Sequence, residues 1–256
     1  QRLSRGLGDV YKRQDLYRLS AEGIGIVRRR CQNSPQTEID TEPGLVRMSW
    51  GKKENNLIAQ IDYMNSVYKT KLSYWSKSKV ADHYSSQKYS DAIFNPDAYQ
   101  LHSLNYVHKC ALDAESLGAK IFERTTAIKV TRRNNSYVVS TNSGDVRANT
   151  VVICTSASRN YVNTKLHNAI LPIGTYVLLT EPLYDRLTEA IRSPYAVSDN
   201  RRIENYYRPL LSTQILWGGG MSTRLKPKNL KQRMLEDLFS VYPQLSGISA
   251  QLAWSG

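Results

Sequence analysis

The segment whose residue types best fit a chemical role is a continuous apolar run that ends in small polar residues. The run covers residues 150–154 and leads directly into Thr155, Ser156 and Ala157. Continuous apolar runs are typical of strands buried on both faces of a parallel sheet. Small residues after such a strand let the phosphates or ribose of a nucleotide approach the backbone. The pattern is compatible with a nucleotide contact, but by itself it favours an ordinary α/β domain with a hairpin insertion.

Nucleophilic and metal-dependent chemistry finds little support in the residue pattern. Cys31, Cys110 and Cys154 are too few and too scattered for a disulfide framework or a zinc site. The histidines have no evident Asp or Cys partner for acid–base or nucleophilic catalysis. We therefore predict no metal ligand and no catalytic side chain, and we expect Cys154 to pack inertly on a buried strand.

Composition indicates a globular protein with a basic surface. The chain has 256 residues, 41% of them hydrophobic, and a formal net charge of +13. Its basic residues are spread along the sequence and lie outside RNA-binding and zinc-finger motifs, so we expect no nucleic-acid partner; a polyanion-binding module is the alternative. No apolar run approaches the ~20 residues of a membrane helix, which predicts no transmembrane segment. Cysteine usage favours a reducing compartment, and we expect the cytoplasm.

The sequence at both ends of the chain indicates truncation. Residues 1–14 resemble a translated adaptor-like tract and are predicted to be non-native, while residues 252–256 form neither a terminal helix nor a polar tail. We therefore expect an internal fragment.

The periodicity of apolar residues predicts two groups of elements. The first group is a helix, a strand, a three-stranded meander and the buried strand; the second is rich in strands and ends in a helix. This order predicts an α/β fold, of the two-domain α+β type, with an antiparallel sheet in the second domain. Helices are expected at 15–31, 55–72, 102–117 and 229–242, and strands at 44–50, 119–123, 127–131, 136–141, 146–148, 150–154, 170–180, 204–208 and 215–217.

Several of these segments resemble the FAD-dependent oxidoreductases of the D-amino-acid oxidase type. The segments are HSLNYVHKCALDAESLGAKIFERTTAIKV and SGDVRANTVVICTSA, followed later by NYYRPLLSTQILWGGG and AWSG. The last two are similar to the family's substrate-domain landmarks, and NYYRPLLSTQILWGGG also resembles the D-Y-Y-R and G-G-G pattern of the γ-glutamylputrescine oxidoreductase-like subgroup. The resemblance covers residues 15–256 in pieces.

The resemblance implies a division into two partial domains. Residues 15–43 and 93–168 would belong to a Rossmann-like FAD-binding domain with a β-meander, and 44–92 and 169–256 to an antiparallel-sheet substrate domain. The family's N-terminal Gly-x-Gly-x-x-Gly turn and C-terminal glycine-rich segment have no counterpart here. Both ends would then be truncated, and we expect this polypeptide alone to be inactive and to bind FAD weakly.

The resemblance also implies contacts with the cofactor FAD. Ile128 matches the backbone contact with the adenine–ribose end, and Thr155, Ser156 and Ala157 match the loop near the phosphates and ribose. The family usually has Gly or Asn where Ser156 stands. The alternatives are a core strand residue for Ile128 and a capped strand end for the loop.

On the substrate side, the resemblance implies roles for Tyr206, Tyr207 and Arg208. Arg208 would hold a carboxylate through a bidentate pair, and a tyrosine would donate a hydrogen bond or line an amine pocket. If the strand alternates, Tyr206 and Arg208 share one face and Tyr207 takes the other. A packing or surface role is the alternative for each.

The reaction that the family implies is oxidation of a C–N bond in a small amine or amino acid, with hydride passing to the flavin. The flavin supplies the chemistry and the protein positions the substrate, so no side-chain base is required. Oxygen or another acceptor would reoxidise the flavin. A polyanion-binding module and a catalytically inactive fragment are the alternative functions.

Overall fold

The computed structural model describes residues 10–32, 41–52, 56–156, 162–210, 213–223 and 228–256. The chain divides into two compact units. The larger unit comprises residues 1–110, 175–222 and 226–256, and the smaller one residues 111–174 and 223–225. The predicted mixed α/β fold class is confirmed, while the predicted assignment of segments to a FAD-binding and a substrate domain stays a prediction.

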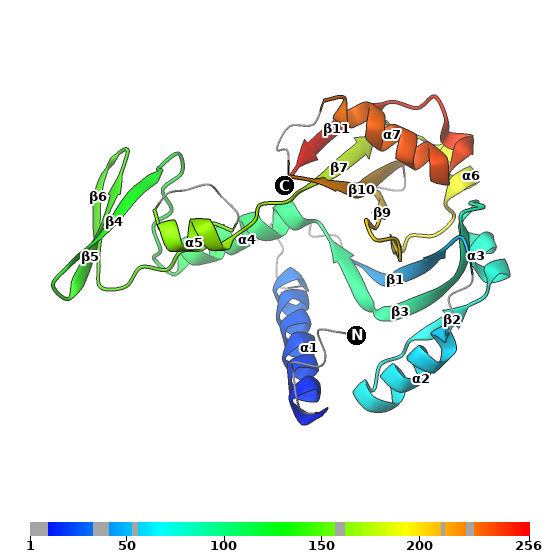
Figure 1. The fold of residues 1–256 in the computed structure, drawn as a ribbon, viewed down its shortest axis with the longest axis horizontal. Helices are drawn as coiled ribbons and strands as arrows, with labels where there is room; N and C mark the ends of the chain where they lie inside the picture. Colours follow the sequence, from blue (N-terminus) through cyan, green and yellow to red (C-terminus); the bar gives the residue numbers. More distant parts are fainter. Residues whose placement is uncertain (1–9, 33–40, 53–55, 157–161, 211–212, 224–227) are drawn as a thin grey trace. The chain divides into compact units, whose positions relative to one another are not determined.

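An eight-stranded sheet forms the centre of the larger unit, in the order β11-β7-β10-β9-β8-β1-β3-β2 (Figure 1). β9 pairs antiparallel with β8 and β10, β3 with β1 and β2, and β11 with β7, whereas β1 and β8 run parallel. The predicted antiparallel sheet therefore contains one parallel pair. The strands are β1 (Thr41–Trp50), β2 (Ser73–Trp75), β3 (Tyr89–Leu101), β7 (Gly174–Thr180), β8 (Ala196–Asp199), β9 (Tyr206–Leu210), β10 (Gln214–Ser222) and β11 (Ala250–Ser255).

One face of this sheet is buried because apolar residues alternate along its strands. Val46, Leu178, Val197, Ile215 and Trp217 are fully buried members of one core cluster. Helix α7 (Leu230–Val241) contributes Leu238 and Val241 to the same cluster. Strand alternation leaves the intervening side chains on the opposite face, which is the face that bears the candidate site.

Two of the predicted helices differ from the structure at their ends, and three short helices, at residues 77–83, 164–169 and 185–190, were not predicted. The helix predicted at 55–72 stops at Tyr68, and the one predicted at 15–31 begins earlier, at Val10. The helices besides α7 are α1 (Val10–Gln32), α2 (Leu57–Tyr68), α3 (Lys77–His83), α4 (Ser103–Ser116), α5 (Thr164–Ala169), α6 (Asp185–Ala190) and the short 3-10 helix η2 (Pro243–Leu245).

The smaller unit contains the predicted meander. β4 (Ala127–Arg133), β5 (Ser136–Thr141) and β6 (Gly144–Ala148) pair antiparallel in sequence order. Gly144 begins β6 with a φ of 129°, a value that side-chain-bearing residues rarely adopt. The meander is therefore confirmed.

Two predicted strands of this unit are wrong. Residues 119–123 and 150–154 have no strand structure, and Val152 is 78% exposed. An apolar run becomes a strand only when a neighbouring strand satisfies its backbone hydrogen bonds, and no described residue pairs with either segment. Cys154 is exposed, so its predicted inert burial is also wrong.

A polar network fixes the loop between β8 and β9. Asp199, only 1% exposed, accepts hydrogen bonds from the backbone amides of Arg201 and Asn205, each at 3.2 Å. Its other oxygen accepts from Arg201 Nε at 2.9 Å. The Arg201 guanidinium lies 4.0 Å from the ring centroid of Trp50. The loop that leads into β9 is thus tied to the end of β8.

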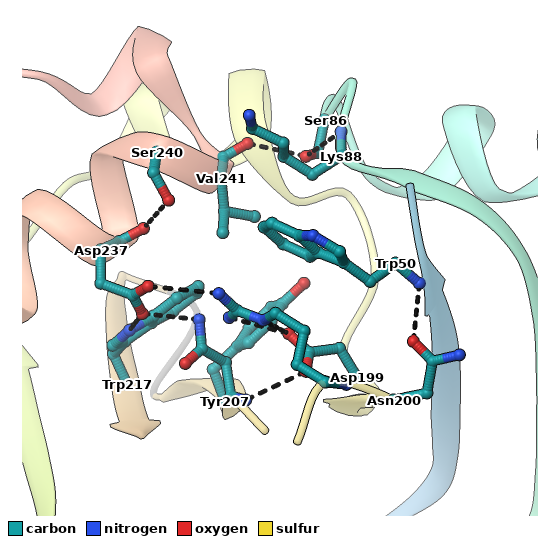
Figure 2. Close-up of polar contacts among 12 residues, drawn as sticks. Trp50, Ser86, Lys88, Asp199, Asn200, Tyr207, Trp217, Asp237, Ser240 and Val241 are labelled. Atoms are coloured by element: carbon teal, nitrogen blue, oxygen red, sulfur yellow. Dashed lines mark hydrogen bonds and ion pairs between the residues drawn. The ribbon is translucent and has the colours of Figure 1, made fainter. Parts of the chain in front are cut away.

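Asp237 ties the same loop to helix α7. Its Oδ2 accepts from Asn205 Nδ2 at 2.6 Å and from Trp217 Nε1 at 3.1 Å, and its Oδ1 accepts from Arg201 Nη1 at 3.4 Å (Figure 2). Burial alone would lower the pKa of Arg201, but the hydrogen bond and charge of Asp199 and the charge of Asp237 outweigh it and raise that pKa. One carboxylate therefore joins the loop, the sheet and the helix.

We expect Asp237→Asn to lower the free energy of unfolding by about 2 kcal/mol, because an amide would turn its NH2 group toward donors that need an acceptor. Urea denaturation followed by tryptophan fluorescence measures the change. Glu236→Gln is the matched control, since Glu236 is exposed one residue earlier on α7. Equal stability of the two variants would contradict the role of the network.

Candidate functional site

A hollow of about 360 Å³ lies on the face of the large sheet opposite α7. Its apolar walls include Leu45 from β1, Val177 from β7 and Leu216 from β10. Its polar groups include Tyr206 and Arg208 from β9. An apolar hollow with a few convergent polar groups is the form that small-molecule sites usually take.

Strand alternation sorts the predicted Tyr-Tyr-Arg group onto two faces. Tyr206 is 39% exposed and Arg208 is half-buried, whereas Tyr207 is 3% exposed. Tyr206 and Arg208 therefore share the open face, as an alternating strand requires. The structure brings these two predicted site residues together in one hollow.

Tyr207 packs in the core, although its strand position is among those that line the hollow. Its ring stacks on Trp217 at 4.6 Å between centroids, and its hydroxyl shares a 2.6 Å hydrogen bond with that of Tyr242. Burial raises the pKa of both phenols well above the usual value. The side chain of Tyr207 thus points away from the open face, and its contact with substrate stays a prediction.

Arg208 holds a charge that no acidic residue compensates within the part of the chain that the structure describes. Its Nη1 donates a long hydrogen bond of 3.4 Å to Oε1 of Gln100. Burial lowers the pKa of its guanidinium, but an arginine stays protonated at neutral pH. A half-buried guanidinium with free donors in an apolar hollow is suited to bind a carboxylate or another planar anion.

Gly218 makes room for the ring of Tyr206. The two residues are directly opposite each other in the β9–β10 pair. A β-carbon added at Gly218 would overlap the Tyr206 ring. The sequence shows the glycine, but it gives no sign that an aromatic ring from the neighbouring strand lies over it.

Gln100 is a further residue of the hollow that sequence reasoning missed. It lies in β3, a strand that was not predicted because Asp91, Asn95, Pro96 and Asp97 interrupt its apolar pattern. The only available signal was Pro96, since proline within a strand indicates an edge or a bulge.

The predicted FAD-contacting residues lie in the smaller unit. Ile128 is 58% exposed on β4. Thr155 and Ser156 are exposed, and Ser156 has a φ of 49°, in the left-handed region that Gly and Asn favour. Ala157 lies outside the described residues. An exposed turn of small residues leaves the backbone accessible to a phosphate or ribose, so these residues fit the predicted group; their contacts with FAD stay predictions.

Metal ions and membrane insertion find no structural support in the described ranges. No cluster of three or more His, Cys, Asp or Glu side chains suitable for a metal occurs there. Within the same ranges, no helix has both the length and the apolar character to cross a membrane.

Comparison with known proteins identifies the family. The model of the DAO family, described as FAD dependent oxidoreductase, matches residues 3–256. The chain belongs to this family. Its members depend on FAD, which agrees with the resemblance noted in the sequence.

Curated relatives are longer than this chain. A probable oxidoreductase OrdL from Haemophilus influenzae is 24% identical over 253 residues, which are 96% of this chain and 58% of the relative. γ-Glutamylputrescine oxidoreductase from Escherichia coli is 25% identical over 239 residues, 92% of this chain and 56% of the relative. The chain therefore spans somewhat more than half the length of these relatives.

Solved structures support the fold assignment. Glycine oxidase from Bacillus cereus superposes with a TM-score of 0.70 at 18% identity, over 96% of this chain and 66% of that protein. L-Proline dehydrogenase from P. horikoshii gives a TM-score of 0.68 at 15% identity, over 90% of this chain and 65% of that protein. The structure thus has the fold of these enzymes.

We expect Gly218→Ala to lower the free energy of unfolding by about 1–3 kcal/mol, because the new methyl group must displace the Tyr206 ring. Urea denaturation gives the value. Gly23→Ala is the control: a β-carbon there meets no atom within 4 Å, and alanine in a helix is expected to add about 0.5–1 kcal/mol. An unchanged free energy of unfolding for Gly218→Ala would show that the Tyr206 ring can move aside at no cost.

Proposed function

We propose that the protein oxidises the C–N bond of a small amine or amino acid, with FAD as the hydride acceptor. The observation that supports this most is Arg208, a half-buried guanidinium in an apolar hollow with no acidic partner among the described residues. The names of the relatives, which include a γ-glutamylputrescine oxidoreductase and a glycine oxidase, point to the same substrate class.

In this proposal, Arg208 holds the carboxylate of an amino-acid-like substrate through two parallel hydrogen bonds. The Tyr206 hydroxyl donates to a second polar group of the substrate, and Leu45, Val177 and Leu216 exclude water from it. Ile128, Thr155 and Ser156 would hold the cofactor through their backbone. When bound, FAD supplies the two-electron oxidation.

The chain contributes position rather than acid–base catalysis. Among the residues that the structure describes, those that line the hollow include no carboxylate, imidazole or thiol. The amine therefore enters the site already deprotonated, and the apolar walls favour that neutral form because burial disfavours a charged ammonium. Oxygen or another electron acceptor and a cytoplasmic location belong to the same proposal.

The experiment that tests the function is anaerobic mixing of candidate substrates with the flavin-loaded protein, expressed from its complete gene. Suitable candidates are γ-glutamylputrescine, glycine, 4-aminobutyrate and butylamine. We expect at least one of them to bleach the flavin absorbance, because hydride transfer reduces the flavin. A flavin that stays oxidised with every amine would overturn the proposal.

We expect Arg208→Gln to raise KM for 4-aminobutyrate by about 10-fold or more, since a charge-assisted pair with the carboxylate is lost. The KM for butylamine, which has no carboxylate, should change by less than about 2-fold. Steady-state kinetics with both compounds measure the difference. Arg202→Gln is the control, because Arg202 is exposed in the neighbouring loop and does not line the hollow. An equal change in both KM values would rule out carboxylate recognition by Arg208.

A further inference from the structure

The end of β3 reaches the hollow because the strand is interrupted by a bulge. β1 and β8 lie between β3 and β9 in the sheet order. The register between β1 and β3 shifts between Pro43 and Leu45, which pair with Tyr99 and Asn95. Beyond this shift, Gln100 lines the same hollow as Arg208. A bulge bends its strand, so the last residues of β3 need not follow the plane of the first ones.

The amide orientation of Gln100 follows from its neighbours. Its Nε2 donates to the carbonyl oxygen of Pro194 at 2.7 Å. A carbonyl accepts hydrogen bonds and cannot donate them, so the amide nitrogen must face Pro194. The amide oxygen must then face Arg208, whose Nη1 lies 3.4 Å away. Gln100 therefore presents a fixed, neutral acceptor to the guanidinium.

A neutral acceptor has a different consequence from a charged one. A carboxylate in this place would pair with Arg208 and compensate its charge. The amide oxygen orients one donor of the guanidinium through a long hydrogen bond and leaves the charge uncompensated. The guanidinium has five N–H donors, and this contact uses one of them. Within the described ranges no other hydrogen bond of this guanidinium occurs, so its remaining donors can serve a ligand.

We propose that Gln100 is a positioning residue that orients Arg208 and, because its amide is neutral, makes the hollow selective for ligands with a carboxylate. The inference rests on the proposed function, since it assigns the substrate class of the same site: amines that also bear a carboxylate. Gln100 acts through Arg208 and contacts no reacting atom.

The test uses binding of a ligand that cannot be oxidised. Butyrate carries a carboxylate and has no C–N bond, and butyramide is its neutral counterpart. For the flavin-loaded protein, expressed from its complete gene, the dissociation constants of both ligands are measured by calorimetry and by the change in flavin absorbance. The variants are Gln100→Glu, which adds a charge, and Gln100→Met, which removes the acceptor at similar length.

We expect Gln100→Glu to weaken butyrate binding by about 10-fold or more and to change butyramide binding by less than about 2-fold. Gln100→Met should weaken butyrate binding by about 3-fold, because Arg208 keeps its charge and loses only the contact that orients it. Gln60→Glu is the matched control: Gln60 Oε1 accepts from Arg47 Nη2 at 2.9 Å at an exposed position, and butyrate binding should not change.

The outcomes separate this inference from the proposed function. If Gln100→Glu and Gln100→Met weaken the binding of butyrate and of butyramide equally, Gln100 is only a structural residue and the inference is wrong. If wild type prefers butyrate and Arg208→Gln abolishes that preference while Gln100→Glu leaves it intact, the inference alone fails. If wild type shows no preference for butyrate over butyramide, carboxylate recognition by Arg208 fails, and the inference fails with it.

Discussion

The carboxylate of Asp237 is the group on which the arrangement of the site depends. It accepts hydrogen bonds from Asn205, Trp217 and Arg201, which belong to the loop before β9 and to β10. The start of β9 fixes which of its residues face the open side of the sheet, because a slip of one residue would exchange the two faces. The network is partly buried, which strengthens its hydrogen bonds relative to those in water, and it joins helix, loop and sheet in one arrangement.

The two faces of β9 then serve different purposes. In the core, Tyr207 stacks on Trp217 and shares a hydrogen bond with the hydroxyl of Tyr242. These contacts fix the strand on its core side. On the open side, Tyr206 lies over Gly218 and Arg208 stands in an apolar hollow. Packing on one face thus fixes the backbone from which the polar groups on the other face project, which reduces the entropy lost when a ligand binds.

Much of this fold follows from the sequence, and the failures have identifiable causes. The meander, α4 and α7 were predictable because their apolar spacing and turn residues agree. The runs at 119–123 and 150–154 are apolar but unpaired, and strand formation depends on partners that a local pattern does not reveal. β3 was missed because polar residues and Pro96 interrupt its apolar pattern, and Pro96 lies at the bulge. The sharing of a face by Tyr206 and Arg208 was predictable from alternation, whereas the role of Gln100 depends on a contact 108 positions away along the chain.

The bulge in β3 separates two parts of one strand that evolution can alter independently. Tyr89, Ala92 and Ile93 before it are buried in the core, and Gln100 after it borders the hollow. An insertion or deletion of one residue within the bulge would turn the side chains of the second part to the opposite face of the sheet. The pairing of the first part with β1 would stay in register. The residue beside Arg208 can therefore change through an insertion or deletion in the bulge, while the residues that stabilise the fold stay the same.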